Sequence, residues 1–167
     1  MIEQTLVILK PDALQRAMIG KIIQRFEDAG LKLKAMKMLN VTKELAEKHY
    51  ADVGKRKGER VFKILVEYVT SGPVIAMVWE GVEAVENARK IIRPTEPKNA
   101  APGTIRGDFA HMDYARADEV NIAVPNLAHG SGNKKEAEYE VNLWFKPEEL
   151  FDYKTINDHF CLLKNGD

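Results

Sequence analysis

The sequence lacks features that would assign it to several common classes of protein. It has one cysteine, Cys161, so no disulfide bond can form within the chain, which fits a reducing compartment. Its 25 basic and 25 acidic residues give zero formal net charge, whereas general binders of nucleic acid or membrane surfaces are usually basic. Its apolar runs at 5–9 and 73–79 are too short for a signal peptide or a membrane span. We therefore expect a soluble cytoplasmic protein with neither nucleic acid nor membrane as a partner.

Several sequence signatures of catalysis are missing as well. The chain contains no G-x-x-x-x-G-K-[ST] loop and no G-x-G-x-x-G after a strand, the two motifs that bind phosphate through the backbone. One cysteine and four scattered histidines offer no zinc-site spacing, and no G-x-S-x-G motif indicates a serine hydrolase. His111, between Asp108 and Asp113, is interpreted as a loop histidine rather than a metal ligand. Phosphate chemistry in this chain would therefore depend on side chains.

The apolar pattern predicts a single α/β domain over residues 1–167. Strands are expected at 5–9, 31–39, 74–79 and near 126–131, and helices at 11–29, 42–50, 61–69, 82–92 and 133–145. A basic loop is expected at 54–60, and the periodic pattern breaks at 93–110. Loop structure with room for one short strand is expected at 111–125, and an irregular tail after 145. This alternation with few strands favours a small sandwich, a sheet with helices on one face.

His129 is the first candidate for chemistry, because it lies between an apolar stretch and a Gly-Ser-Gly turn that precedes a helical pattern. A neutral imidazole is a nucleophile near pH 7 when one ring nitrogen is free and the other is held. Glu140 can hold the ring if the helix at 133–145 folds back over the turn, and Ser131 places a hydroxyl nearby. Spacing alone nevertheless favours a histidine with a structural role.

Three cationic side chains stand in unusual places. Lys10 directly follows an apolar strand and precedes a proline, and side chains at strand ends reach into sites held by rigid elements. Arg89 lies on the polar face of an amphipathic helix, and Arg106 lies in a loop rich in proline and glycine. Taken alone, Lys10 and Arg89 are better explained as solvated surface charges. For Arg106, a structural ion pair with Asp108 is as plausible as a role in binding a ligand.

Six stretches of sequence, in order, resemble the nucleoside diphosphate kinases and span nearly the whole chain. They are TLVILKPDALQR at the start, EKHYAD at 47–52, SGPVIAMVWEG at 71–81, PGTIRGDF at 102–109, NLAHGSG at 126–132 and LWFKPEEL at 143–150. The resemblance implies a ferredoxin-like fold, a four-stranded antiparallel sheet with covering helices, and assembly into a homo-oligomer, either a tetramer or a hexamer. It also implies Mg²⁺-dependent transfer of the γ-phosphate from a nucleoside triphosphate to a nucleoside diphosphate through a phosphohistidine, which maintains NTP and dNTP pools.

The resemblance gives each matched residue a role. It implies that His129 is phosphorylated, that Glu140 and Ser131 hold its ring, and that Lys10 and Tyr50 contact the transferring phosphate. The nucleotide-binding and metal positions are implied to be Arg89, Thr95 and Arg106 at the phosphates, Asn126 at the sugar, and Asp52, which is linked to the metal through water.

The sequence departs from the family pattern in four places. Gly132 stands where an aspartate usually follows HGS, and Val61 takes the place of the aromatic residue that stacks on the base, with Phe62 as the alternative. The segments 54–60 and 110–125 are longer than usual. A relative that binds nucleotide without catalysis is the alternative function, whereas the neutral charge argues against an RNA-binding module. Every matched chemical position is intact, which favours the enzyme.

Overall fold

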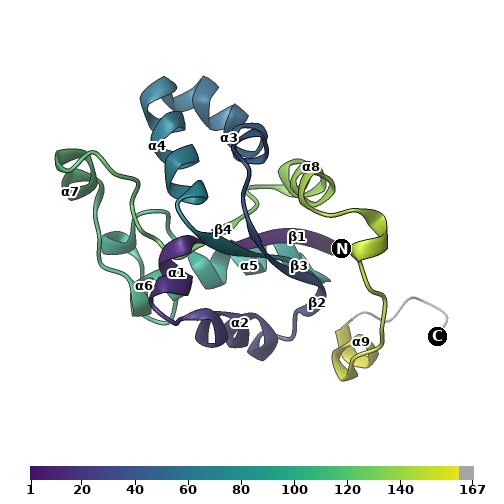
Figure 1. The fold of residues 1–167 in the computed structure, drawn as a ribbon. Helices are drawn as coiled ribbons and strands as arrows, with labels where there is room; N and C mark the ends of the chain where they lie inside the picture. Colours follow the sequence, from purple (N-terminus) through teal and green to yellow (C-terminus); the bar gives the residue numbers. More distant parts are fainter. Residues whose placement is uncertain (162–167) are drawn as a thin grey trace.

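The computed structural model describes residues 1–161, and its centre is an antiparallel sheet of four strands (Figure 1). The strands are β1 (Ile2–Leu9), β2 (Lys32–Asn40), β3 (Pro73–Val82) and β4 (Ala128–Gly130), in the spatial order β2-β3-β1-β4. β1 pairs with β3 on one side and with β4 on the other, so the short strand that carries His129 is an edge strand beside the buried centre. The expected ferredoxin-like class is confirmed.

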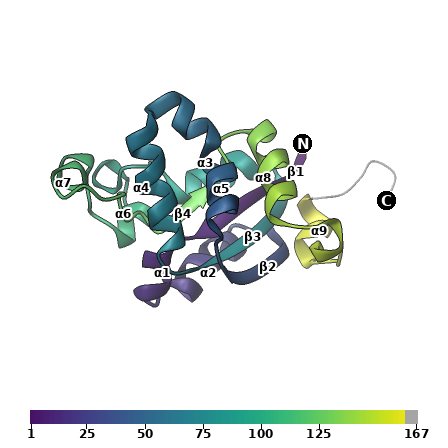
Figure 2. The same cartoon turned by 45° about the horizontal axis from the view of Figure 1, so that its top comes forward.

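Helices cover both faces of this sheet, which corrects the expectation of a single covered face (Figures 1 and 2). One layer contains α1 (Pro11–Gln15), α2 (Ile19–Asp28), α5 (Ala84–Ile92) and α6 (Ile105–Phe109); the other contains α3 (Lys43–Lys57), α4 (Glu59–Thr70) and α8 (Lys134–Trp144). Val7 and Leu9 of β1 face the first layer, and Leu6 and Ile8 face the second. Because neighbouring strand residues point to opposite faces, four consecutive apolar residues require cover on both sides.

Two predicted boundaries differ because of single residues. The helix expected at 11–29 is interrupted between α1 and α2, where Ala17 adopts a left-handed backbone conformation with φ 53°. The loop expected at 54–60 is largely helical, since α3 continues to Lys57 and α4 begins at Glu59. Gly58, with φ 88°, is the only residue between them, and its conformation is one that glycine adopts without steric cost.

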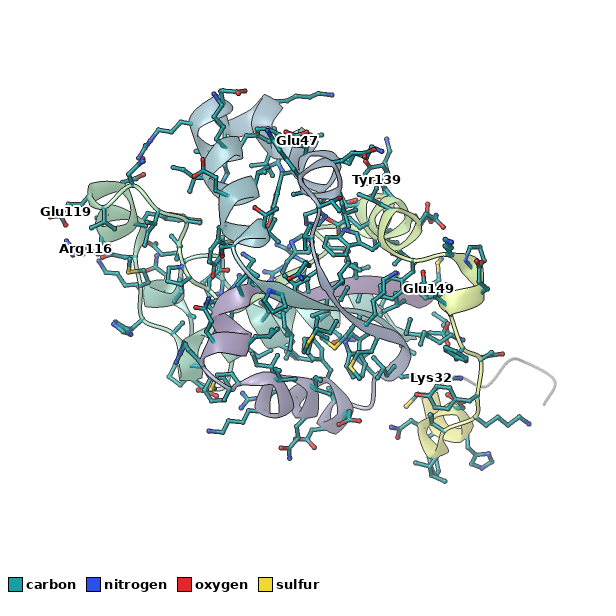
Figure 3. All side chains as sticks on the ribbon, viewed as in Figure 1. Lys32, Glu47, Arg116, Glu119, Tyr139 and Glu149 are labelled. Atoms are coloured by element: carbon teal, nitrogen blue, oxygen red, sulfur yellow. The ribbon has the colours of Figure 1, made fainter. Side chains whose placement is uncertain are left out.

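The segments expected to lack helices contain short ones. The 3₁₀ turn η1 (Pro97–Asn99), α6 and α7 (Tyr114–Glu119) lie within 93–125, and η2 (Pro147–Glu149) and α9 (Ile156–Cys161) lie in the tail. α7 is too short to show a helical period, but Asp113 caps it by accepting a hydrogen bond from the backbone N–H of Arg116 at 2.8 Å. Arg116 and Glu119 pair at 2.7 Å on its outer side (Figure 3).

α7 stands apart from the sheet, at the end of the molecule opposite α9 (Figure 1). It is connected to α4 through Arg60, which lies 3.3 Å from the carboxylate of Asp118 and donates to Asn121 Oδ1 at 3.0 and 3.2 Å. Among the described residues, every helix is too short or too polar to cross a membrane.

Candidate functional site

A cavity of about 1100 Å³ opens between the α3–α4 pair and the segment that runs from the end of α5 through α7 to β4. Every residue that the sequence singled out for the site lines this cavity, except Ser131. Those lining residues come from separate parts of the chain: Lys10, Tyr50, Asp52, Val61, Arg89, Thr95, Arg106, Asn126, His129 and Glu140. The structure therefore brings the candidate residues into one site.

The register between β4 and β1 fixes the position of His129. His129 lies opposite Ile8, and the residues that follow β1 hold the chain just before β4. The backbone N–H of Lys10 donates to the carbonyl of Leu127 at 2.8 Å, and Asp12 Oδ2 accepts from the N–H of Leu127 at 3.0 Å. The Lys10-Pro11-Asp12 stretch thus anchors the approach to His129 as well as supplying an ammonium group.

The His129 ring is held at one nitrogen. Its Nε2 lies 3.0 Å from each carboxylate oxygen of Glu140, which is buried on α8. Ser131, which is fully buried, donates its hydroxyl hydrogen to Glu140 Oε2 at 2.6 Å. Nδ1 of His129 makes no hydrogen bond within residues 1–161, and the ring borders the cavity. α8 does fold back over the Gly-Ser-Gly turn, so the three side chains meet.

The charge of Glu140 sets the tautomer of His129. Burial acts to raise the pKa of Glu140, but His129, His49 and the Ser131 hydroxyl outweigh it and lower that pKa to about 2. An ionised carboxylate only accepts hydrogen bonds, so Nε2 of His129 carries the proton and Nδ1 retains its lone pair. The nucleophilic nitrogen of a neutral ring is therefore Nδ1.

Lys10 is a buried cation with one polar contact. Its Nζ donates to Asn126 Oδ1 at 2.8 Å, and 6% of the residue is exposed. Burial lowers the pKa of Lys10 to about 7, helped by the positive charge of Arg106 and opposed by Asp12. An anion placed beside Nζ would favour the charged form of Lys10.

Arg106 connects the loops around His129 and is not paired with Asp108, which corrects the structural alternative. Its guanidinium donates to the carbonyls of Pro94, Asn126 and Ala128, while Asp108 pairs with Arg25 at 2.9 Å. Burial lowers the pKa of Arg106 to about 10, so the group stays charged at neutral pH. Lys10, Arg89 and Arg106 are the cations that the sequence singled out, and the cavity wall also contains Lys48, Lys55, Arg56, Lys57, Arg60 and Arg93.

The other predicted residues occupy different depths of the cavity. The amide of Asn126 donates to the carbonyl of Thr95 at 2.8 Å, which joins two cavity walls. The Tyr50 hydroxyl is buried without a hydrogen-bond partner among the described residues, and burial raises its pKa. Asp52 is exposed and pairs with Arg56. An exposed carboxylate such as that of Asp52 would suit a Mg²⁺ ion that is held mainly by phosphate and water oxygens.

At the outer end of the cavity, Val61 forms part of the wall and Phe62 does not. Phe62 packs instead against the core beneath α3, α4 and α8. The long segment whose role the sequence left open supplies the facing wall, with Tyr114, Ala117, Asp118, Ile122, Ala123 and Val124. The Arg60 contacts to Asp118 and Asn121 hold this wall against α4.

Gly132 lies against Glu136 of α8. The backbone N–H of Gly132 donates to Glu136 Oε2 at 3.1 Å, and a Cβ at position 132 would contact that carboxylate. The acidic side chain beside the turn therefore comes from the first turn of α8.

Sequence reasoning missed His49 as part of the site, although it lies in the EKHYAD stretch. Its side chain is 1% exposed, and its ring centre lies 4.5 Å from that of His129. Nδ1 of His49 accepts a hydrogen bond from the indole of Trp144 at 3.2 Å. Its position next to Tyr50 was the available signal, but neighbours in a helix point in different directions.

Comparison with known proteins gives a consistent result. Residues 3–150 match the model of the nucleoside diphosphate kinase family. The chain is 51% identical to the nucleoside diphosphate kinase of Pyrococcus abyssi, covering 95% of this chain and 93% of that one. It is 47% identical to nucleoside diphosphate kinase B of Bos taurus, covering 91% of each. The nucleoside diphosphate kinase of Borrelia burgdorferi, solved as a transition-state mimic with vanadate and ADP, superposes with a TM-score of 0.94 at 40% identity, covering 96% of this chain and 97% of that one.

Proposed function

Because this chain belongs to the nucleoside diphosphate kinase family and has nucleoside diphosphate kinase function, we propose that His129 carries the phosphoryl group between donor and acceptor. The observation that carries this proposal is the hydrogen bond between Nε2 of His129 and the Glu140 carboxylate, which leaves Nδ1 with its lone pair at the cavity. The Borrelia relative was solved as a transition-state mimic with bound vanadate and ADP, which supports phosphoryl transfer as the reaction.

In the first half-reaction, Nδ1 of His129 attacks the γ-phosphorus of a nucleoside triphosphate. The bond from that phosphorus to the bridging oxygen breaks, and its electron pair leaves on the β-phosphate of the diphosphate product. The ring gains positive charge as the new P–N bond forms, and the Glu140 carboxylate at Nε2 stabilises that charge. No proton has to leave the site.

The second half-reaction is the reverse with a different nucleotide. A terminal oxygen of the acceptor diphosphate attacks phosphorus, the P–N bond breaks, and its electron pair returns to Nδ1 of His129. A covalent intermediate allows one site to serve donor and acceptor in turn. Such a site must bind phosphates and sugar, which suits the cationic lining and the wall formed by Asn126 and Thr95.

Lys10, Arg89 and Arg106 would surround the phosphates and stabilise the spreading negative charge in the transition state. Tyr50 would offer its unpartnered hydroxyl to the same group. Mg²⁺, when bound with the nucleotide, supplies further charge neutralisation, and Asp52 would hold it through water.

The alternative is a family member that binds nucleotide without transferring phosphate. Incubation with ATP labelled on its γ-phosphate and no acceptor separates the two. The enzyme retains label on the protein that is acid-labile and base-stable, releases ADP, and passes the label to any added diphosphate. A binding protein retains no covalent label, and that result would overturn the proposal.

Glu140→Gln is expected to slow phosphorylation of His129 without abolishing it, because an amide keeps a hydrogen bond but removes the charge. The expected loss is about 10–100-fold, as for partners that orient metal-bound histidines. Single-turnover quench experiments measure it. Glu138→Gln is the matched control, since Glu138 is exposed on the same helix. Unchanged kinetics in Glu140→Gln would mean that the carboxylate does not act on the ring.

Val61→Phe is expected to lower the Michaelis constant for nucleoside diphosphates, because Val61 offers no aromatic face to a base. Base–aromatic stacking contributes about 1–3 kcal/mol in single-strand binders, and part of this should be recovered. The catalytic rate constant should change little, since stacking is equal in ground and transition states. Val61→Leu is the control for added apolar volume.

Two outcomes would contradict this assignment of the base wall. A higher Michaelis constant in Val61→Phe would mean that Ile122, Ala123 or Val124 already fills the space. Phe62→Ala should lower the unfolding temperature with little effect on nucleotide affinity, because Phe62 packs in the core. Strong loss of affinity in that variant would make Phe62 the stacking partner.

We further propose that the protein acts in the cytoplasm, where it maintains NTP and dNTP pools, and that it assembles as a tetramer or hexamer. The single cysteine supports a reducing compartment, and the family resemblance supports the assembly. Mass measurement in solution by light scattering tests the oligomer, and a monomer would contradict it.

A further inference from the structure

Behind the His129–Glu140 pair lies a second pair of buried rings, His49 on α3 and Trp144 at the end of α8. The two rings meet edge to face at 5.5 Å, and the indole N–H of Trp144 donates to Nδ1 of His49 at 3.2 Å. His49 also lies edge to face against His129 at 4.5 Å. It thus stands between the indole and the ring that we propose to be phosphorylated.

The indole determines which nitrogen of His49 carries a proton. An indole N–H can only donate, so Nδ1 of His49 must present its lone pair, and the proton of the neutral ring lies on Nε2. Burial lowers the pKa of His49 to about 3, with His129 and Lys10 acting in the same direction and Glu140 opposing them. His49 is therefore a neutral ring with one tautomer.

This tautomer is not the one that His49 would adopt by itself. Nε2 of His49 is buried without a hydrogen-bond partner among the described residues, whereas Nδ1 lies 3.7 Å from Oε1 of Glu140. If the indole were absent, a proton on Nδ1 would lie beside the Glu140 carboxylate instead of on the unpartnered Nε2, which is the more favourable arrangement. The Trp144 N–H prevents it, because two donors would then face each other.

We propose that His49 and Trp144 are positioning residues for His129: Trp144 holds His49 in the tautomer that cannot donate to Glu140, which reserves the Glu140 carboxylate for Nε2 of His129. The neutral His49 ring also forms the wall on which the His129 ring rests. This inference rests on the proposed function, because it assigns a purpose to the orientation of the phosphorylated ring.

Trp144→Phe tests the pair, since it keeps a ring and removes only the donor. Free of the indole, His49 is expected to carry its proton on Nδ1 and to donate to Glu140, which weakens the bond to His129. Nuclear magnetic resonance of isotope-labelled histidines reads this change of tautomer directly and independently of activity. Phosphorylation in single-turnover experiments is expected to slow roughly tenfold, while the dissociation constant for a nucleoside diphosphate stays the same.

The double variant Trp144→Phe with His49→Phe separates positioning from packing. Phenylalanine at position 49 keeps a ring against His129 and has no proton to offer Glu140, so the double variant is expected to phosphorylate within about threefold of the parent and faster than Trp144→Phe. If the pair only fills the core, the loss of rate in each variant is expected to follow its loss of unfolding temperature and not the tautomer of His49. His49→Phe alone leaves the indole N–H buried and unpaired, so its unfolding temperature is expected to fall below that of the double variant.

Two results would overturn the inference. The first is a parent-like rate and an unchanged His49 tautomer in Trp144→Phe, and the second is a double variant slower than Trp144→Phe. Absence of covalent label in the parent protein would instead contradict the proposed function, and the tautomer measurement would still stand. The two failures are therefore distinguishable.

Discussion

His129→Ala is expected to abolish phosphoryl transfer while nucleotide binding is largely retained. Nδ1 of His129 is the atom that forms the covalent bond, and no other group in the described site combines a free lone pair with an orienting carboxylate. Removing a covalent nucleophile elsewhere costs on the order of 10⁴-fold or more, and we expect a loss of that size here. Steady-state transfer and retention of γ-phosphate label both measure it.

Nucleotide affinity should survive the loss of His129 because the phosphates are expected to contact Lys10, Arg89 and Arg106. Isothermal titration calorimetry of the variant with a nucleoside diphosphate checks this. His111→Ala is the matched control, since His111 is exposed and lies outside the cavity wall. Appreciable turnover in His129→Ala would contradict the ping-pong mechanism, as would covalent labelling that persists without the ring.

Lys10→Met is expected to lower the catalytic rate constant by about 10²–10³-fold, the usual cost of removing one preorganised donor to transition-state charge. The side chain keeps most of its length and apolar stem, so the cavity retains its shape while losing the ammonium group. Lys63→Met, at an exposed position on α4 away from the cavity, is the control for loss of a positive charge. A parent-like rate would mean that Lys10 does not reach the transferring phosphate.

The depressed pKa of Lys10 adds a pH signature to this prediction. The pKa of Lys10 is about 7 in the folded protein without nucleotide and 10.5 in the unfolded chain, so between these values the unfolded chain binds more protons. Stability of the free protein is therefore expected to rise with pH in this window, and Lys10→Met is expected to flatten that rise. Thermal unfolding at several pH values measures both.

Nucleotide binding should reverse the effect, because phosphate oxygens beside Nζ of Lys10 raise its pKa. Binding above pH 7 is then accompanied by proton uptake, and affinity falls as pH rises. Calorimetry at pH 8 in buffers that differ in ionisation enthalpy counts the protons taken up. Lys10→Met should take up fewer protons than the parent, and equal uptake would assign the proton to another group.

The sequence alone determined the elements with strong periods and the order in which they occur. The strands β1, β2 and β3 and the helices α2, α4, α5 and α8 were predicted from their apolar patterns, because each element buries a face or a whole run of apolar residues. The helix α3 was predicted from its cap at Thr42, and β4 only as a strand edge near 126–131. Short elements escaped prediction: α7 and α9 have six residues each, which is less than two helical turns, so no period can appear. The break between α1 and α2 at Ala17 could not be predicted either, because the apolar stripe continues through it.

The candidate residues could also be chosen from the sequence, since KPD, TIRGD and NLAHGSG place cations and an imidazole at the ends of elements. The hydrogen bonds between these residues could not be predicted from the sequence. The Lys10–Asn126 contact joins residues 116 positions apart, and the Trp144–His49 contact joins residues 95 apart. Which nitrogen of His129 is held, and which tautomer His49 adopts, depend on such contacts because a hydrogen bond selects its donor by geometry.

The ionisation of the site residues and the packing around the cavity also depend on contacts between segments that are distant in the sequence. Nothing near Lys10 in the chain indicates a pKa of about 7, because desolvation depends on what packs over a side chain and not on its sequence neighbours. Packing between distant segments likewise places helices on both faces of the sheet. It also places Val61 instead of Phe62 at the cavity wall, and α7 opposite α4. Local patterns report the period of a segment, whereas its surroundings exist only after the chain has folded.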